Sequence, residues 1–202
     1  MKYLNELISR YPELEVCKNS ITETINAICL MHNNGGKLLI CGNGGSAADC
    51  EHISGELLKG FLLERRPDTS KYDGAEDIIS KLQNGITAIP LPCFTSLTTA
   101  FSNDENSVLS FAQLVFVMGK SEDVFLGIST SGNSQNVIAA AKTAKAKKLK
   151  TIAMTGQDES ELSDICDIVL RVPEKETFKI QELHQPVYHA ICAQVEKILF
   201  KK

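Results

Sequence analysis

The sequence has no long hydrophobic run and contains little proline or glycine, 6 and 13 residues among 202. These low counts exclude collagen-like and low-complexity chains, and the apolar fraction of 43% is that of an ordinary globular protein. No apolar run approaches the roughly 18 to 20 residues needed to cross a bilayer, and residues 1–10 mix charged with apolar side chains, unlike a signal-peptide core. We therefore expect a cytoplasmic protein of one domain, without a membrane partner.

Basic residues are fewer than acidic ones, with 21 Lys and Arg against 25 Asp and Glu, so the formal net charge is −4. This balance argues against a nucleic-acid partner bound through a basic surface, although it leaves room for a local anion site. The seven cysteines form no CxxC pair, and an odd, scattered set indicates free thiols in a reducing compartment. Composition alone says nothing about the reaction.

Apolar periodicity predicts an alternation of strands and helices after two N-terminal helices that end near residues 33–36. Short apolar runs predict buried strands at 37–41, 86–90, 124–128, 151–154 and 168–172. Helical patterns occupy 47–58, 96–101, 107–117, 134–147, 160–164 and 178–200. Continuous apolar strands separated by helices are typical of a sheet covered on both faces. We expect an α/β fold, with a doubly wound, mostly parallel five-stranded sheet and an N-terminal helical extension.

The polar, charged stretch 62–85 interrupts this alternation and is expected to be an insertion over the sheet edge, with a short helix near 75–81. The sequence shows no internal repeat and no interdomain linker. The chain is therefore interpreted as one domain, 1–202, made of the extension 1–34, the α/β core and the insertion at about 62–85.

Two loops rich in glycine and hydroxyl groups follow predicted strands, at 42–46 (Gly-Asn-Gly-Gly-Ser) and 129–134 (Ser-Thr-Ser-Gly-Asn-Ser). Ligands of open α/β sheets bind beyond the carboxyl ends of strands, and helix N-termini favour anions. Neither loop is a Walker or GxGxxG motif, so a sugar phosphate is favoured over a nucleotide. The alternative is that the glycines only form turns and Ser134 only caps a helix.

The helix after the first loop carries His52 and Glu56 four residues apart, so both project from one face, about 6 Å apart along the axis. This spacing suits two ligands of one metal or an acid/base pair, and the alternative is a surface hydrogen-bonded pair. The final helix carries Gln181 and His189, separated by about 12 Å of rise. Both reach one metal only if Pro186 kinks the helix or if different subunits contribute. Taken alone, His189 is better interpreted as a packed helix histidine.

Together these features resemble the sugar isomerase (SIS) domain superfamily and, within it, the phosphoheptose isomerases. The matching stretches are 41–49 with His52 and Glu56, then Asn103-Asp104, then 123–134, and finally 180–184 with His189. Asn103 and Asp104 follow a short predicted helix, and we expect them to form a turn. The resemblance covers nearly the whole chain outside the insertion. The family usually has a polar residue and Arg where this chain has Phe178 and Lys179.

The resemblance implies a substrate crevice, a metal and partner subunits. The implied substrate-binding residues are Asn43, Gly44, Gly45, Ser46, Glu56, Asn103, Asp104, Ser129, Thr130, Ser131, Ser134 and Gln181, with the four hydroxyl residues at 129–134 holding the phosphate. The implied ligands of one zinc ion per subunit are His52, Glu56, Gln181 and His189. Glu56 and His189 are the implied catalytic acid/base pair, in a homotetramer with active sites at subunit contacts.

The implied reaction is the aldose-ketose isomerisation of sedoheptulose 7-phosphate to D-glycero-D-manno-heptose 7-phosphate, through an enediol, for bacterial lipopolysaccharide or capsule biosynthesis. The rival is a non-catalytic SIS-domain protein resembling the initiator-associating protein, which binds the replication initiator DnaA. In that group the positions equivalent to Glu56 and His189 are typically lost. Both are present here, which favours the enzyme.

Overall fold

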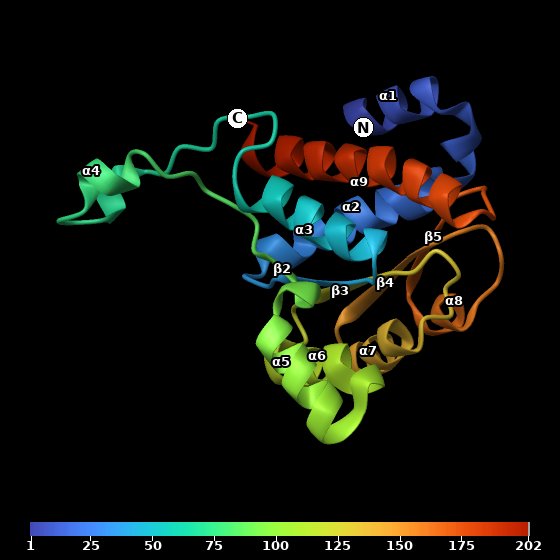
Figure 1. Ribbon diagram of the computed structural model, residues 1–202. Helices are drawn as coiled ribbons and strands as arrows, with labels where there is room; N and C mark the ends of the chain where they lie inside the picture. Colours follow the sequence, from blue (N-terminus) through green and yellow to red (C-terminus); the bar gives the residue numbers. More distant parts are fainter. Residues whose placement is uncertain (202) are drawn as a thin grey trace.

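A computed structural model describes residues 1–201 and has at its centre a five-stranded, fully parallel sheet in the order β2-β1-β3-β4-β5 (Figure 1). The strands are β1 (Leu38–Cys41), β2 (Ala88–Pro90), β3 (Val124–Ile128), β4 (Lys150–Thr155) and β5 (Ile168–Arg171). In register, Leu38 lies beside Ala88 on one side and Val124 on the other. The predicted doubly wound α/β fold is confirmed, with every strand parallel.

Helices cover both faces of the sheet (Figure 1). One face carries α1 (Lys2–Arg10), η1 (Pro12–Cys17), α2 (Lys18–Asn33), α3 (Gly45–Leu58) and α9 (Thr177–Phe200). The other carries η3 (Leu91–Cys93), α5 (Thr95–Phe101), η4 (Ser102–Asn106), η5 (Ser107–Leu109), α6 (Ser110–Met118), α7 (Gln135–Ala146) and α8 (Glu161–Ile165). No helix of residues 1–201 is long and apolar enough to cross a membrane.

The two layers explain why the strands read as unbroken apolar runs. Successive side chains of a strand point to opposite faces, and in β1 Leu38 and Ile40 belong to the core beneath α2, α3 and α9. Leu39 and Cys41 belong instead to the core beneath α6 and α7. Because both faces are covered, each residue of the strand must be apolar.

The segment 62–85 extends away from the body of the molecule (Figure 1). It contains η2 (Thr69–Lys71) and α4 (Glu76–Ile79), which is shorter than the helix predicted at 75–81. Its two ends are held together at the body, where the Asn84 amide donates to the Arg65 carbonyl at 2.7 Å and the Ile86 amide to the Leu57 carbonyl at 2.9 Å.

The predicted turn at Asn103-Asp104 is wrong, because both residues lie in η4, a π-helical turn that continues directly from α5. The Ser102 hydroxyl donates to the Thr98 carbonyl four residues earlier, and the Asn103 amide donates to the Asp104 carboxylate at 2.8 Å. Polar side chains that bond locally in this way allow the helix to widen without ending.

Candidate active site

The two glycine and hydroxyl loops follow β1 and β3, which are neighbours in the sheet and mark the point where the strand order reverses. Open α/β sheets bind ligands at this switch point. A reciprocal amide pair ties the first loop to the first turn of α7, which follows the second loop, since Asn43 and Asn136 each donate to the other at 2.9 Å. The predicted loops therefore form one continuous edge.

The backbone of the first loop requires glycine at two positions. Gly44 has φ of +56°, a conformation that disfavours residues with a Cβ. A Cβ at Gly45 would stand only 2.6 Å from the side-chain nitrogen of Gln181, so glycine lets α9 approach the start of α3. Ser46 is buried, whereas Asn43 is exposed at the loop surface.

The second loop directs hydroxyl groups toward one another and toward backbone amides. The Ser129 and Ser134 hydroxyls are 3.0 Å apart, and the Asn133 amide donates to the Ser131 hydroxyl at 3.2 Å. Ser134 occupies the N-cap position of α7, yet its side chain makes no capping hydrogen bond. Its hydroxyl is oriented instead to that of Ser129. Thr130 is half-buried beside them.

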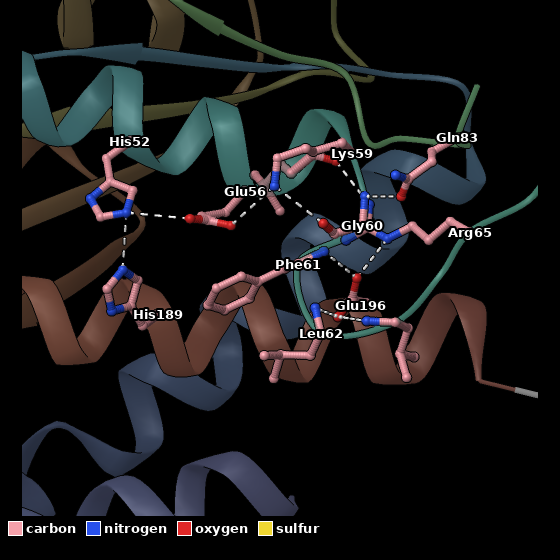
Figure 2. Close-up of polar contacts among 12 residues, drawn as sticks. His52, Glu56, Lys59, Gly60, Phe61, Leu62, Arg65, Gln83, His189 and Glu196 are labelled. Carbon is pink, nitrogen blue, oxygen red and sulfur yellow. Dashed lines mark hydrogen bonds and ion pairs between the residues drawn. The ribbon is translucent and has the colours of Figure 1, made fainter. Parts of the chain in front are cut away.

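Side by side, α3 and α9 bring together three of the residues predicted to bind a metal. His52 Nε2 lies 3.3 Å from Glu56 Oε1 and 3.3 Å from His189 Nε2. Figure 2 shows the two imidazoles turned toward each other across the helix pair, with the Glu56 carboxylate beside them. The Glu56 side chain is 17% exposed and that of His52 40%, so the group is accessible yet partly desolvated.

The surroundings of the His189 ring disfavour its protonated form. Burial lowers the pKa of His189, the neighbouring His52 lowers it further, and the Glu56 carboxylate opposes the shift. A neutral imidazole carries one N–H, so two facing ring nitrogens share at most one hydrogen bond. A ligand that displaces this single contact can use the ring lone pair that accepts it.

The donor set fits a divalent metal in its chemistry. Nitrogen and oxygen ligands 2.0 to 2.2 Å from a tetrahedral zinc ion lie roughly 3.3 Å from one another, the separation found on both sides of His52. In residues 1–201, however, no group of three or more His, Cys, Asp or Glu side chains is arranged so that it could hold a metal ion. His189 and Glu56 make no direct ion pair.

Gln181 is not brought into contact with the other three predicted ligands. Its side-chain nitrogen lies beside Gly45 at the first turn of α3, and α9 runs without interruption through Pro186. Gln181 and His189 are thus about 12 Å apart along one helix.

Asn103 and Asp104 are also apart from this group. Both are exposed in η4, on the face of the sheet opposite α3 and α9 (Figure 1). In the described residues, the histidines and the Asn103-Asp104 pair therefore lie on opposite faces of the sheet.

Two residues near His52 were not singled out in the sequence. The Tyr188 hydroxyl lies 3.0 Å from His52 Nδ1 and 3.2 Å from Asp49 Oδ1. Burial raises the pKa of Tyr188 and also that of Asp49, whereas the Tyr188 hydroxyl and His52 oppose the rise at Asp49. Two features of the sequence could have pointed to these residues: Asp49 lies three positions before His52, and Tyr188 lies directly before His189.

Phe61 borders the same group, with its ring centroid 5.8 Å from that of His189. Its backbone is fixed by Glu196, whose carboxylate accepts the amides of Phe61 at 2.8 Å, Leu62 at 2.7 Å and Leu63 at 3.1 Å (Figure 2). Arg65 completes the arrangement through Nε at 2.8 Å. The chain leaving α3 is therefore clamped to α9 beside the candidate site.

A cavity of about 440 Å³ lies between α1 and α9 and reaches His189 and Phe61. Tyr3 and Arg10 line its α1 side, and Gln185 lines its α9 side. The cavity gives small polar molecules access to the His189 ring.

Comparison with known proteins defines the class: residues 2–156 match the SIS domain family, to which the chain belongs. The phosphoheptose isomerase of Maridesulfovibrio salexigens is 39% identical over 181 residues, covering 90% of this chain and 80% of that protein. More particularly, the chain therefore belongs to the phosphoheptose isomerases and is an isomerase. A metal cofactor is consistent with this family.

Solved structures agree with the sequence relationship. The phosphoheptose isomerase of Neisseria gonorrhoeae is 33% identical with a TM-score of 0.75, over 95% of this chain and 94% of that one. The enzyme of Francisella tularensis is 28% identical with a TM-score of 0.79, over 97% and 95% of the two chains.

Proposed function

We propose that this protein isomerises sedoheptulose 7-phosphate to D-glycero-D-manno-heptose 7-phosphate. The observation that carries the proposal is the meeting of His52, Glu56 and His189 on the α3–α9 pair of a chain that belongs to the phosphoheptose isomerases. A binding protein without activity has no need for this acid, base and ligand set. The rival binding function is not favoured by the relatives.

The phosphate is assigned to the second loop, through the hydroxyls of Ser129, Thr130, Ser131 and Ser134. Hydroxyl donors and the N-terminus of α7, a helix of 12 residues, hold an anion without a basic side chain. The first loop, Asn43 to Ser46, borders the sugar.

Isomerisation moves one proton between C1 and C2 of the sugar. In our assignment, the Glu56 carboxylate removes a proton from C1 of the ketose and returns it to C2. His189 transfers protons at the oxygens, delivering one to O2 as the enediol forms and removing one from O1 as the aldehyde forms. Glu56 Oε1 faces His52, whereas Oε2 lies 3.9 Å from Lys59 Nζ, so the two oxygens have different surroundings.

His52, Glu56, Gln181 and His189 are proposed to hold one zinc ion per subunit. When bound, the metal polarises the carbonyl oxygen and stabilises negative charge on it. The 3.3 Å separations at His52 support three of these ligands. Gln181 joins them only if its side chain swings from Gly45 along α9 or if a second chain supplies it.

The protein is proposed to act as a homotetramer. The exposed positions of Asn103 and Asp104, on the face opposite the histidines, support a site completed by another copy. Mass measurement of the native assembly tests this, with a monomer at assay concentrations as the contradicting result. The cytoplasmic location, the single-domain division and the role in lipopolysaccharide or capsule synthesis stay predictions.

The function is tested by incubating the purified protein with sedoheptulose 7-phosphate in D2O and following deuterium at C2 of the heptose product by NMR. Metal content is measured in the same preparation. Product formation by the wild-type protein supports the proposal. Absence of turnover in a zinc-saturated, correctly folded protein contradicts it, and co-purification with the replication initiator would then favour the binding protein.

A further inference from the structure

Tyr188 connects the candidate metal site to a carboxylate that has no assigned role. Its side chain is buried on α9, and its hydroxyl lies between His52 Nδ1, at 3.0 Å, and Asp49 Oδ1, at 3.2 Å. His52 and Asp49 are both on α3. The hydroxyl therefore bridges the two helices immediately behind the imidazole that faces His189.

The direction of the two hydrogen bonds follows from the number of protons available. A phenol has one O–H to donate, and a carboxylate only accepts. Both contacts are satisfied when Tyr188 donates to Asp49 and His52 donates from Nδ1 to the Tyr188 oxygen. If Tyr188 donated to His52 instead, its oxygen and that of Asp49 would face each other without a proton between them.

The consequence appears at the opposite nitrogen of the ring. A neutral imidazole with its proton on Nδ1 has a free lone pair on Nε2. In this chain Nε2 is the atom directed at Glu56 and His189 (Figure 2). Histidines that bind metals typically donate their other N–H to a carboxylate or another acceptor, which fixes the tautomer.

We propose that Asp49 and Tyr188 are positioning residues that hold His52 in the Nδ1–H tautomer, ready to bind a metal through Nε2. The inference rests on the metal site of the proposed function, but not on the identity of the sugar. The T-shaped packing of the two rings, 5.4 Å between centroids, holds the Tyr188 hydroxyl in place.

The test is the variant Tyr188→Phe, which removes the hydroxyl and keeps the ring. Long-range 1H–15N spectra of the metal-free protein report the tautomer of His52, and competition with a chromophoric chelator reports zinc affinity. We expect a dominant Nδ1–H form in the wild-type protein and a shift toward Nε2–H in the variant. Loss of an outer hydrogen bond of this kind lowers metal affinity by about ten- to a hundredfold.

Matched variants separate positioning from general damage. Tyr72→Phe, in the extended segment 62–85, should change neither the tautomer nor the zinc affinity. Asp49→Ala removes the acceptor and should act as Tyr188→Phe does, which also covers the case in which Tyr188→Phe fails to fold. Asp49→Asn keeps an oxygen acceptor and should restore part of the Nδ1–H population.

An unchanged His52 tautomer and unchanged zinc affinity in folded Tyr188→Phe would overturn the proposal. A shifted tautomer with weaker zinc binding, in a protein whose wild-type form does not turn over sedoheptulose 7-phosphate, would support the inference while refuting the proposed function. The two failures are therefore distinguishable.

Discussion

The α3–α9 pair carries two polar groups that differ in their burial and in their hydrogen bonding. The histidine cluster, consisting of His52, Glu56 and His189, is partly exposed and contains two ring nitrogens 3.3 Å apart that share at most one proton. The Glu196 anchor, consisting of Glu196, Arg65 and the amides of 61–63, is almost wholly buried. Both carboxylate oxygens of Glu196 accept two hydrogen bonds each.

The two groups differ in how far they are removed from water. A charge removed from water is tolerated only when its hydrogen-bonding capacity is filled, as at Glu196. The histidine cluster is partly exposed to solvent, and His189 also borders a cavity. The histidine cluster and the Glu196 anchor lie within a few helical turns of each other on the same pair of helices.

The largest expected effect is on catalysis, at the histidine cluster. Glu56→Gln removes the proposed base and should lower kcat by about two to four powers of ten, because general acid/base catalysis contributes that much. Thermal unfolding should change little. Glu51→Gln, exposed on the same helix, is the control and should keep full activity. Near-normal turnover in Glu56→Gln would refute the assignment.

The next largest effect is on folding, at the Glu196 anchor. Glu196→Gln leaves Arg65 buried without its charge partner and should lower the free energy of unfolding by about 3 to 5 kcal/mol. Urea denaturation measures this. Glu64→Gln, which breaks the exposed pair with Arg66, should cost at most about 1 kcal/mol. Equal losses in the two variants would contradict the contrast between buried and exposed pairs.

Acid should destabilise the fold through a third polar group on α9. Burial lowers the pKa of His184 to about 4 from its ordinary value of 6.5, although Nε2 faces the Thr155 carbonyl at 3.3 Å. Between pH 4 and pH 6.5 the unfolded chain binds more protons at this histidine than the folded protein does. The free energy of unfolding is therefore highest above pH 6.5 and falls by about 3 kcal/mol as the pH drops toward 4. Unfolding measured at both pH values should show a smaller loss in His184→Gln, which keeps a donor for Thr155. A pH dependence identical to that of the wild-type protein would contradict this.

The smallest effect tests whether the two groups are independent. Zinc at a hundredfold excess over its dissociation constant should raise the free energy of unfolding by about 2.7 kcal/mol. The increment should disappear in His52→Ala and survive in Glu196→Gln, since distant groups contribute additively. Calorimetry with and without zinc measures it. Loss of the increment in Glu196→Gln would show that the anchor and the cluster are coupled.

Local patterns in the sequence were sufficient for most of the fold. Apolar runs bounded by turn residues predicted all five strands, although β2 covers only Ala88–Pro90 of the expected 86–90. The predicted helix at 47–58 begins two residues earlier, at Gly45, because the loop glycine Gly44 occupies its N-cap. Asn103-Asp104 was misjudged, since polar residues after a short helix usually mark a turn and here bond within a π-helical turn.

The sequence by itself determined the parallel α/β fold, the two loops of glycine and hydroxyl residues and the pairing of His52 with Glu56, because these depend on residues a few positions apart. Only the tertiary structure decided that His189 meets His52, that Tyr188 bridges His52 to Asp49, and that Glu196 anchors the chain after α3. These contacts join residues more than 130 positions apart. Their geometry depends on how α9 packs beside α3, which no local periodicity encodes.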